Sequence, residues 1–216
     1  DNYLKIKKKR TSFILIDLIC RGVPTINLWR QYLRDKKLEK QKILEVQFRN
    51  PEKGWKDKYL YVQSERKTIS HCEKNDTFYQ FFNMESCYME SCYECNFRIS
   101  SKADIRLGDY WGKECSKEDL KYGVSMVASF STAGNELLKQ LKLEKKISLE
   151  KRPIKDYFVG QGPINSIIPV YYNKLLEDLE EQKGSLKKLM YKHFCIKYLN
   201  RKIGVYRVRI KKILKR

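Results

Sequence analysis

The stretch Phe13-Ile-Leu-Ile-Asp-Leu-Ile-Cys20 is a continuous apolar run that contains one charged residue, Asp17. Runs of this length and composition are typical of a strand that is covered on both faces. We therefore expect an interior strand from Phe13 to Cys20, followed by a loop over residues 22–25. Because cofactors in open α/β sheets bind beyond the carboxyl ends of strands, Cys20 would stand where a site is expected.

The residues after this run predict an α/β fold in which helices flank a mixed sheet. Thr25 is a candidate N-cap for a helix that reaches about Lys40, and the buried side of that helix would carry Ile26, Trp29, Tyr32 and Leu33. Further strands are expected over residues 43–49, 55–63, 104–111 and 123–131, and helices over 77–82, 132–141, 170–182 and 185–199. Such an alternation of strands and helices is the order of an α/β domain.

Positive charge is concentrated at the two ends of the chain. The formal net charge is +20, of which residues 187–216 carry +12 and residues 1–10 carry +4, which leaves +4 for residues 11–186. A groove that binds nucleic acid is usually basic within the folded body as well. The charge distribution therefore does not favour a nucleic-acid partner.

The sequence predicts neither a transmembrane span nor a signal peptide, because the longest apolar run is short and lacks a cleavage-type ending. We therefore expect the seven cysteines to lie in a reducing, cytoplasmic environment. There, clustered cysteines more often bind metal or carry out redox chemistry than form disulfides. Because the chain begins at Asp1, we also expect a fragment that lacks the N-terminal part of its protein.

The strongest chemical signal is the cysteine-rich segment Cys87-Tyr-Met-Glu-Ser-Cys92-Tyr-Glu-Cys95. Two thiolates separated by two residues can hold one metal centre from a single turn, and soft sulfur ligands favour zinc, copper(I) or iron–sulfur clusters. The full spacing of the three cysteines, C-x4-C-x2-C, also occurs in plant-type ferredoxins. The alternative is that these residues are packed thiols, since free cysteine is among the most buried residue types. We favour metal binding by Cys92 and Cys95 and leave Cys87 open.

Zinc is the rival metal, because zinc sites commonly combine two cysteine pairs, or one pair with histidines. The two histidines are His71, beside Cys72, and His193, which lies in a predicted helix at a position compatible with packing. Cys72, Cys115 and Cys195 are expected to be structural.

Four motifs follow one another along the chain. They are Asp17-Leu-Ile-Cys20-Arg21-Gly-Val-Pro-Thr25, Phe48-Arg49-Asn-Pro-Glu-Lys53-Gly54-Trp55, Ser91-Cys92-Tyr-Glu-Cys95-Asn-Phe97, and Ala103-Asp104-Ile-Arg-Leu-Gly108-Asp109-Tyr-Trp111-Gly112. Gly123-Val-Ser-Met-Val, followed by a helix that begins near Thr132, continues the order. In this order the motifs resemble the C-terminal domain of the β subunits of coenzyme F420 hydrogenases and dehydrogenases, which are iron–sulfur flavoproteins.

The resemblance implies an α/β fold with FAD beside a [4Fe–4S] cluster. The cluster ligands that it implies are Cys20, Cys92 and Cys95. The family's fourth cysteine stands in an upstream glycine–threonine–proline–cysteine turn that this chain lacks. Three alternatives stay open: the fragment has lost that turn, Cys87 or Cys115 substitutes for it, or no complete cluster forms. The chain also departs from the family at Arg21, where histidine is frequent, and at Met89, where arginine is usual.

The resemblance also implies a set of flavin-binding residues, namely Arg49, Lys53, Trp55, Gly108, Asp109, Trp111 and Gly112. The tryptophans would form aromatic walls, the glycines would let the backbone approach the cofactor, and Asp109 would accept a hydrogen bond. The two basic residues would meet phosphate or carboxylate groups. The alternative is structural: the aspartate caps a turn, the glycines serve backbone geometry, and Trp55 belongs to the core.

The activity that the resemblance implies is that of an oxidoreductase. Electrons would pass between a deazaflavin such as coenzyme F420, bound FAD and the cluster, with other redox subunits or a ferredoxin-like protein as partners. A role in surface-polysaccharide biosynthesis is a second interpretation of the same resemblance. The catalytic residues are unknown.

We predict a redox domain over residues 1–168 and a helical, basic extension over residues 169–216. In that extension Leu186, Leu189, Met190 and Phe194 recur at near-helical spacing with lysines between them. This pattern suits an interfacial helix on an anionic membrane, or a helix packed on the domain with a solvated lysine face, which we favour. The competing function is a zinc-stabilised module whose basic tail contacts nucleic acid or an anionic membrane.

Overall fold

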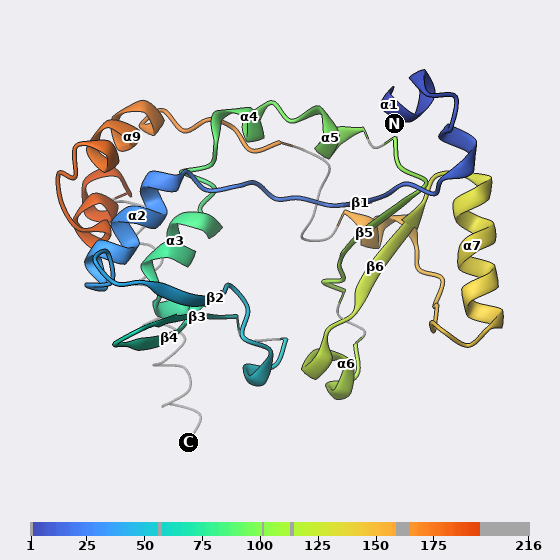
Figure 1. Ribbon diagram of the computed structural model, residues 1–216, viewed down its shortest axis with the longest axis horizontal. Helices are drawn as coiled ribbons and strands as arrows, with labels where there is room; N and C mark the ends of the chain where they lie inside the picture. Colours follow the sequence, from blue (N-terminus) through green and yellow to red (C-terminus); the bar gives the residue numbers. More distant parts are fainter. Residues whose placement is uncertain (1, 56–57, 101, 113–114, 159–164, 195–216) are drawn as a thin grey trace. The chain divides into compact units, whose positions relative to one another are not determined.

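The computed structural model describes residues 2–55, 58–100, 102–112, 115–158 and 165–194, and the chain divides into two compact units (Figure 1). The first unit comprises Asp1–Gly22, Pro51–Lys56 and Ser91–Ser166, and the second comprises Val23–Asn50, Asp57–Glu90 and Ile167–Arg216. Each unit contains a three-stranded sheet together with helices, so the prediction of an α/β fold is confirmed. The chain passes between the units several times, which local sequence patterns did not reveal.

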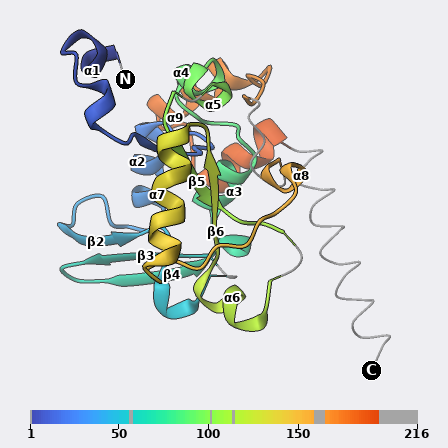
Figure 2. The ribbon, with the colours of Figure 1, turned by 90° about the vertical axis from the view of Figure 1, so that its right-hand side faces the viewer.

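The sheet of the first unit is mixed, as predicted. Its central strand is β5 (Ile105–Asp109), with β1 (Ile16–Leu18) parallel on one side and β6 (Ser125–Ser129) antiparallel on the other. Helix α7 (Thr132–Leu143) lies beside this sheet (Figure 2). A Cβ atom at Gly134 would lie 2.6 Å from the carbonyl oxygen of Asp104, so glycine is what lets the helix approach the strand.

The prediction of an interior strand from Phe13 to Cys20 is wrong. Within the described residues β1 spans Ile16–Leu18 and forms an edge of its sheet, where Ile16 is 55% and Leu18 is 70% exposed. Between them Asp17 accepts hydrogen bonds from the side chain of Arg106 on β5. The run therefore does not reflect burial on two faces, and any site near Cys20 has to be argued from contacts.

The remaining elements of the first unit are short. They are α1 (Asn2–Ile6), η1 (Arg10–Ser12), η2 (Pro51–Lys53), α4 (Glu90–Tyr93), α5 (Asn96–Ile99), α6 (Lys117–Tyr122) and α8 (Ile154–Tyr157). The boundary between the two units falls inside α4, because Glu90 belongs to the second unit and the rest of the helix belongs to the first.

The second unit is built on an antiparallel sheet in the order β2 (Ile43–Gln47), β3 (Tyr59–Ser64), β4 (Thr68–Cys72). Its helices are α2 (Ile26–Asp35), α3 (Thr77–Asn83), α9 (Tyr172–Glu180) and residues 186–194, with η3 (Glu73–Asn75) before α3. Strand β4 was not predicted, since Ile69 is its one fully buried residue.

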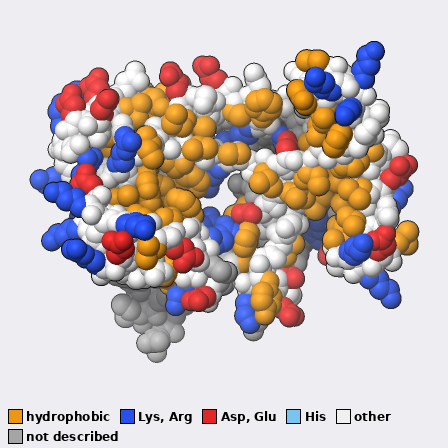
Figure 3. Space-filling model, viewed as in Figure 1, with side chains coloured by type: hydrophobic (Ala, Val, Ile, Leu, Met, Phe, Trp, Pro, Cys, Tyr) orange, Lys and Arg blue, Asp and Glu red, His pale blue; other side chains and the backbone are white. Residues whose placement is uncertain are grey.

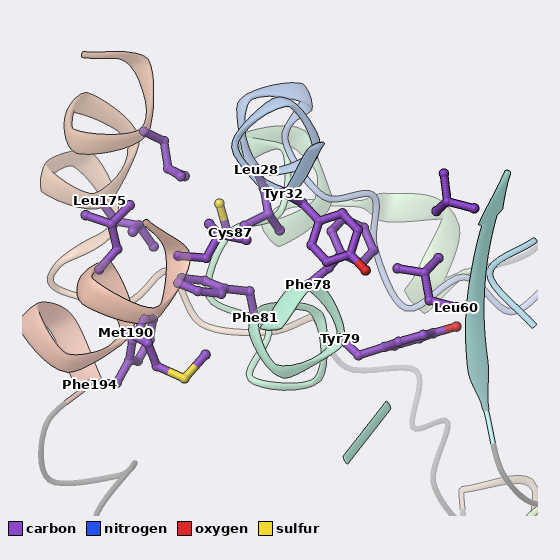
Figure 4. Close-up of a cluster of buried hydrophobic side chains, with 14 of the residues drawn as sticks. Leu28, Tyr32, Leu60, Phe78, Tyr79, Phe81, Cys87, Leu175, Met190 and Phe194 are labelled. Carbon is purple, nitrogen blue, oxygen red and sulfur yellow. The ribbon is translucent and has the colours of Figure 1, made fainter. Parts of the chain in front are cut away.

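The core of the second unit lies between these helices and β3 (Figure 4). It includes Tyr32 from α2 as predicted, and Trp29 and Leu33 pack against it. Ile26 is 56% exposed, contrary to expectation, because α2 turns Leu28 inward instead.

The helix over residues 186–194 is packed in this core. Its apolar residues, which are Leu186, Leu189, Met190 and Phe194, are at most 3% exposed. His193 lies with its Nε2 atom 2.7 Å from Oδ2 of Asp178, a buried carboxylate that also accepts a hydrogen bond from Lys192. The packed interpretation of this helix is therefore confirmed, whereas Cys195 and the tail to residue 216 lie outside the described residues.

One face of the surface carries charges of both signs (Figure 3). On the face drawn in Figure 3, Lys and Arg side chains are interspersed with Asp and Glu side chains. Across the described part of the chain, no helix combines the length and the apolar composition that crossing a membrane requires.

Candidate cofactor site

Three of the predicted ligand cysteines belong to the first unit, and none of the three forms a disulfide. Cys20 is exposed in the loop that follows β1, Cys92 lies in α4, and Cys95 precedes α5 as its N-cap residue. Cys92 and Cys95 are partly buried. Reduced thiols with this accessibility are the kind of sulfur that can become a metal ligand.

The segment of Cys95 is tied directly to the segment of Cys20. Arg98 on α5 donates a hydrogen bond of 3.0 Å from Nη1 to the carbonyl oxygen of Arg21, the residue after Cys20. The same turn is held by a second hydrogen bond, in which Nδ2 of Asn165 donates to the carbonyl oxygen of Cys95 at 3.2 Å. Two segments that are remote in sequence are thus fastened side by side.

Asn165 also carries an orphaned acceptor beside this turn. Its Oδ1 atom is buried and has no hydrogen-bond partner among the described residues. Leaving a buried acceptor unsatisfied costs roughly 1–3 kcal/mol, so this oxygen has room for a hydrogen bond from water or from another bound group. The environment of Cys95 is therefore compatible with an additional bound group.

A β-bridge limits how far the segments of Cys20 and Cys92 can lie from one another. Pro24 and Tyr88 form an antiparallel β-bridge, and Cys20 stands four residues before Pro24 while Cys92 stands four residues after Tyr88. Because a chain spans at most about 3.6 Å per residue, each cysteine lies within roughly 14 Å of the bridge residue nearest to it in sequence.

In this structure the three thiols do not form a metal-binding group. Among the described residues, no group of three or more His, Cys, Asp or Glu side chains is arranged to hold a metal ion. The donor chemistry and the tethered segments fit a sulfur-ligated cluster, and the ligand set stays a prediction.

Cys87 and Cys115, the candidates for a fourth ligand, differ in their surroundings. Cys87 is 1% exposed in the core of the second unit (Figure 4), with Sγ 3.2 Å from Oγ1 of Thr25. Burial raises the pKa of its thiol to about 11, although the hydrogen bond with Thr25 opposes the shift. A ligand has to be a thiolate, so this environment favours a packed thiol. Cys115 is partly buried in the first unit, and burial raises the pKa of its thiol.

Among the described residues, neither histidine joins a group of three or more His, Cys, Asp or Glu side chains that could hold zinc. His71 lies on β4, and burial, followed by the charge of Lys36, lowers the pKa of its imidazole. His193 is engaged with Asp178 as described above.

The two predicted aromatic walls lie together in the first unit. The rings of Trp55 and Trp111 stack with their centroids 6.3 Å apart and their planes inclined by 30°. The backbone N–H of Trp55 donates to the carbonyl oxygen of Lys121 at 2.9 Å, and a Cβ atom at Gly123 would lie 2.4 Å from the indole. Gly123 also has φ of +88°, so both the contact with the indole and the backbone conformation require glycine there.

The loop after β5 leads from the sheet to this tryptophan pair. Gly108 and Asp109 end β5, paired with Met126 and Ser125 of β6. Beyond them Trp111 is 37% exposed. Gly112 follows, where a Cβ atom would collide with the hydroxyl end of Tyr110. A partly exposed indole at the end of a central strand is a suitable surface for a planar ring.

The two basic residues of the prediction lie in different units. Arg49 belongs to the second unit, where its charge lowers the pKa of Tyr79 against the larger, opposite effect of burial. Lys53 is exposed at the end of η2 in the first unit. Their contact with a phosphate or carboxylate group stays a prediction.

Sequence reasoning missed Arg106, the most buried charged side chain near these segments, at 2% exposure. Arg106 lies on β5 directly opposite Asp17 on β1. The available signal was an acidic residue, Asp17, inside an apolar run and a basic residue, Arg106, between Ile105 and Leu107.

One comparison with known proteins gives a match. A family model that describes the C terminus of the beta subunit of coenzyme F420 hydrogenase/dehydrogenase matches residues 3–155. Searches among curated proteins and among solved structures gave no match.

Proposed function

The chain belongs to the coenzyme F420 hydrogenase/dehydrogenase beta-subunit family, and we propose that it is the electron-transferring part of an oxidoreductase that works with other redox subunits. Members of this family are subunits of redox enzymes, and the match covers more than half of the chain. The observation that carries the proposal further is the hydrogen bond from Arg98 to the carbonyl of Arg21, which joins the Cys95 turn to the Cys20 loop.

In this proposal Cys20, Cys92 and Cys95 hold a [4Fe–4S] cluster. Their thiols form no disulfide and are at least partly accessible, and they belong to one compact unit. Sulfur ligands suit such clusters, which need ligands that converge from separate segments. A fourth ligand would come from Cys115 more readily than from Cys87, because Cys87 belongs to a packed core.

FAD would bind against the tryptophan pair. When bound, it would accept two electrons as a hydride and release them singly, which suits a carrier between a deazaflavin and a one-electron cluster. The exposed side of Trp111 would stack on the isoalloxazine ring, Trp55 would hold that indole in place, and Asp109 would accept a hydrogen bond from the cofactor. Lys53 would meet its phosphates.

The physiological donor is proposed to be reduced coenzyme F420, and the acceptor a ferredoxin-like protein or a further redox subunit. If the protein instead acts in surface-polysaccharide synthesis, it would use the same cofactors on a different final substrate. In either case the protein supplies binding, orientation and electrostatics, while the cofactors supply the electron chemistry.

The proposed function can be tested by anoxic hydride transfer. The purified chain is loaded with FAD, reduced coenzyme F420 is added, and bleaching of the bound flavin is followed spectroscopically, with NADH as the control donor. We expect bleaching by the deazaflavin in the wild-type chain. A chain that binds no FAD would contradict the proposal. A colourless chain that contains stoichiometric zinc would contradict it as well and would support the zinc-stabilised binding module.

A further inference from the structure

We propose that Arg106 is a positioning residue that fixes the segments of Cys20 and Cys95 against the central strand β5. This inference rests on the proposed cluster site, because it says how two of the cysteines are held within reach of one another. Arg106 makes no contact with the thiols in the proposal. It acts through the backbone and the carboxylate that flank them.

The first half of the arrangement is an ion pair with Asp17. Nε of Arg106 donates to Oδ1 of Asp17 at 3.0 Å, and Nη2 donates to Oδ2 at 2.8 Å. Two parallel hydrogen bonds between a guanidinium and a carboxylate fix orientation as well as distance. Asp17 stands three residues before Cys20, so this pair anchors the start of the Cys20 loop to β5.

The second half reaches the other cysteine segment. Nη2 of Arg106 donates to the carbonyl oxygen of Phe97 at 2.5 Å, and Nη1 donates to that of Arg98 at 3.2 Å. These carbonyls follow Cys95 by two and three residues. One guanidinium therefore holds both segments at once. The hydrogen bond from Arg98 to the carbonyl oxygen of Arg21 joins the two segments directly.

Because Arg106 is buried, its guanidinium needs a hydrogen-bond partner for each donor. A charge that is 2% exposed is costly unless each of its donors has a partner. The hydrogen bonds of Asp17 outweigh the opposing effect of burial and raise the pKa of Arg106, so the side chain stays charged. Because a planar fork with five donors is needed to reach a carboxylate and two carbonyls together, lysine cannot replace it.

An ion pair that served stability alone would need no contact with the Cys95 turn. The donors that Asp17 leaves over point to the carbonyls of Phe97 and Arg98 on a four-residue helix whose Phe97 side chain is 80% exposed, and Nη1 also lies 3.5 Å from the hydroxyl of Tyr157. Short elements of this kind are poorly held by packing, so a charged anchor is what determines their position. Support of this type around metal ligands typically governs affinity by tenfold or more.

The test uses the full chain as wild type and as the variants Arg106→Gln, Arg106→Lys and Asp17→Asn. The matched control is Arg10→Gln, because Arg10 forms an ion pair of 2.9 Å with Asp104 in the same unit. The first measurement is the rate at which Cys20 and Cys95 are alkylated in the metal-free chain, read residue by residue by mass spectrometry. The second is the rate at which iron is lost to a chelator after anaerobic reconstitution with iron and sulfide.

We expect the three test variants to alkylate Cys95 several-fold faster than wild type and to lose iron about tenfold faster. Arg10→Gln should match the wild type in both measurements, and circular dichroism should show all chains folded. If Arg106→Gln fails to fold, Asp17→Asn and Arg106→Lys decide the question.

Alkylation and iron loss that are unchanged in the folded variants would overturn the role of Arg106. So would equal changes in Arg10→Gln. If the wild type takes up no iron and sulfide, the proposed function fails; alkylation of Cys20 and Cys95 in the metal-free chain then still decides whether Arg106 positions them.

Discussion

Trp55 and Trp111 stack with their ring centroids 6.3 Å apart, and Gly123 lies against the Trp55 indole. The two residues come from motifs that are far apart in the sequence, and both belong to the first unit. A pair of stacked indoles, one of them 37% exposed, gives a rigid aromatic surface beside the end of β5.

We predict that Trp111→Leu weakens FAD binding by about fivefold, because removal of one aromatic contact costs on the order of 1 kcal/mol. Trp111→Phe should retain most of the affinity, since it keeps an aromatic ring. Quenching of flavin fluorescence on titration measures both. Equal affinity in Trp111→Leu and wild type would show that the flavin does not stack there.

Cys87 should be the least reactive of the described cysteines. Burial raises the pKa of its thiol to about 11, and alkylating reagents attack the thiolate. At pH 8 we expect iodoacetamide to modify exposed Cys20 rapidly and Cys87 slowly in the folded chain, and both at similar rates in denaturant.

The same pKa shift has a consequence for stability. A thiol whose pKa is raised in the folded state contributes stability below its unfolded pKa of about 8.5, and this contribution is lost as the pH rises toward about 11. Denaturant unfolding between these pH values should show a fall in the free energy of unfolding of the wild type as the pH rises. The fall should be smaller in Cys87→Ser. The same slope in both chains would contradict the assignment.

Leu189→Ala should destabilise the second unit by about 2–5 kcal/mol, because Leu189 is 2% exposed in its core. Lys188→Ala, on the same helix and exposed, should change the free energy of unfolding by no more than about 0.5 kcal/mol. Chemical denaturation followed by circular dichroism gives both values. A small effect of Leu189→Ala would mean that this helix is not packed as described.

Asp104 should make the first unit sensitive to acid. Burial opposes ionisation of its carboxyl group, but hydrogen bonds from the Leu15 N–H, the Ser131 hydroxyl and Arg10 outweigh it and lower the pKa. A carboxyl group with a lowered folded pKa stabilises the protein above its unfolded pKa of about 3.9, and the benefit is lost as the pH falls through the folded value.

We therefore expect Asp104→Asn to lose about 1–3 kcal/mol at pH 7 and to converge with wild type at low pH. Glu136→Gln, on the exposed side of α7, is the control and should follow the wild type throughout. A constant difference between Asp104→Asn and wild type from pH 7 to pH 2 would contradict the titration of Asp104.

Elements with a clear period or cap were predictable from sequence. The helix predicted over residues 77–82 is α3, which Asp76 caps by accepting a hydrogen bond from the N–H of Tyr79. The apolar face of residues 186–194 also repeats at helical spacing. Strand β4 escaped prediction because its pairing with β3, and not its own composition, makes it a strand.

Burial of single residues was less predictable, because neighbours that are distant in sequence decide it. Spacing alone could not separate Cys87, which packs in a core with Leu28 and Phe81, from the more accessible Cys92. In the same way the apolar run before Cys20 suggested two-sided burial, while the pairing of Asp17 with Arg106 depends on a strand almost ninety residues away.

The central claim is that Cys20, Cys92 and Cys95 hold an iron–sulfur cluster, and iron and acid-labile sulfide per chain after anaerobic reconstitution test it most directly. Wild type should bind both in equal amounts, up to about four of each per chain, and be brown. Cys20→Ser, Cys92→Ser and Cys95→Ser should each lower the content sharply, whereas Cys72→Ser, which changes a free thiol of the second unit, should not. A colourless wild type without iron and sulfide, or serine variants that retain the full content, would contradict the account.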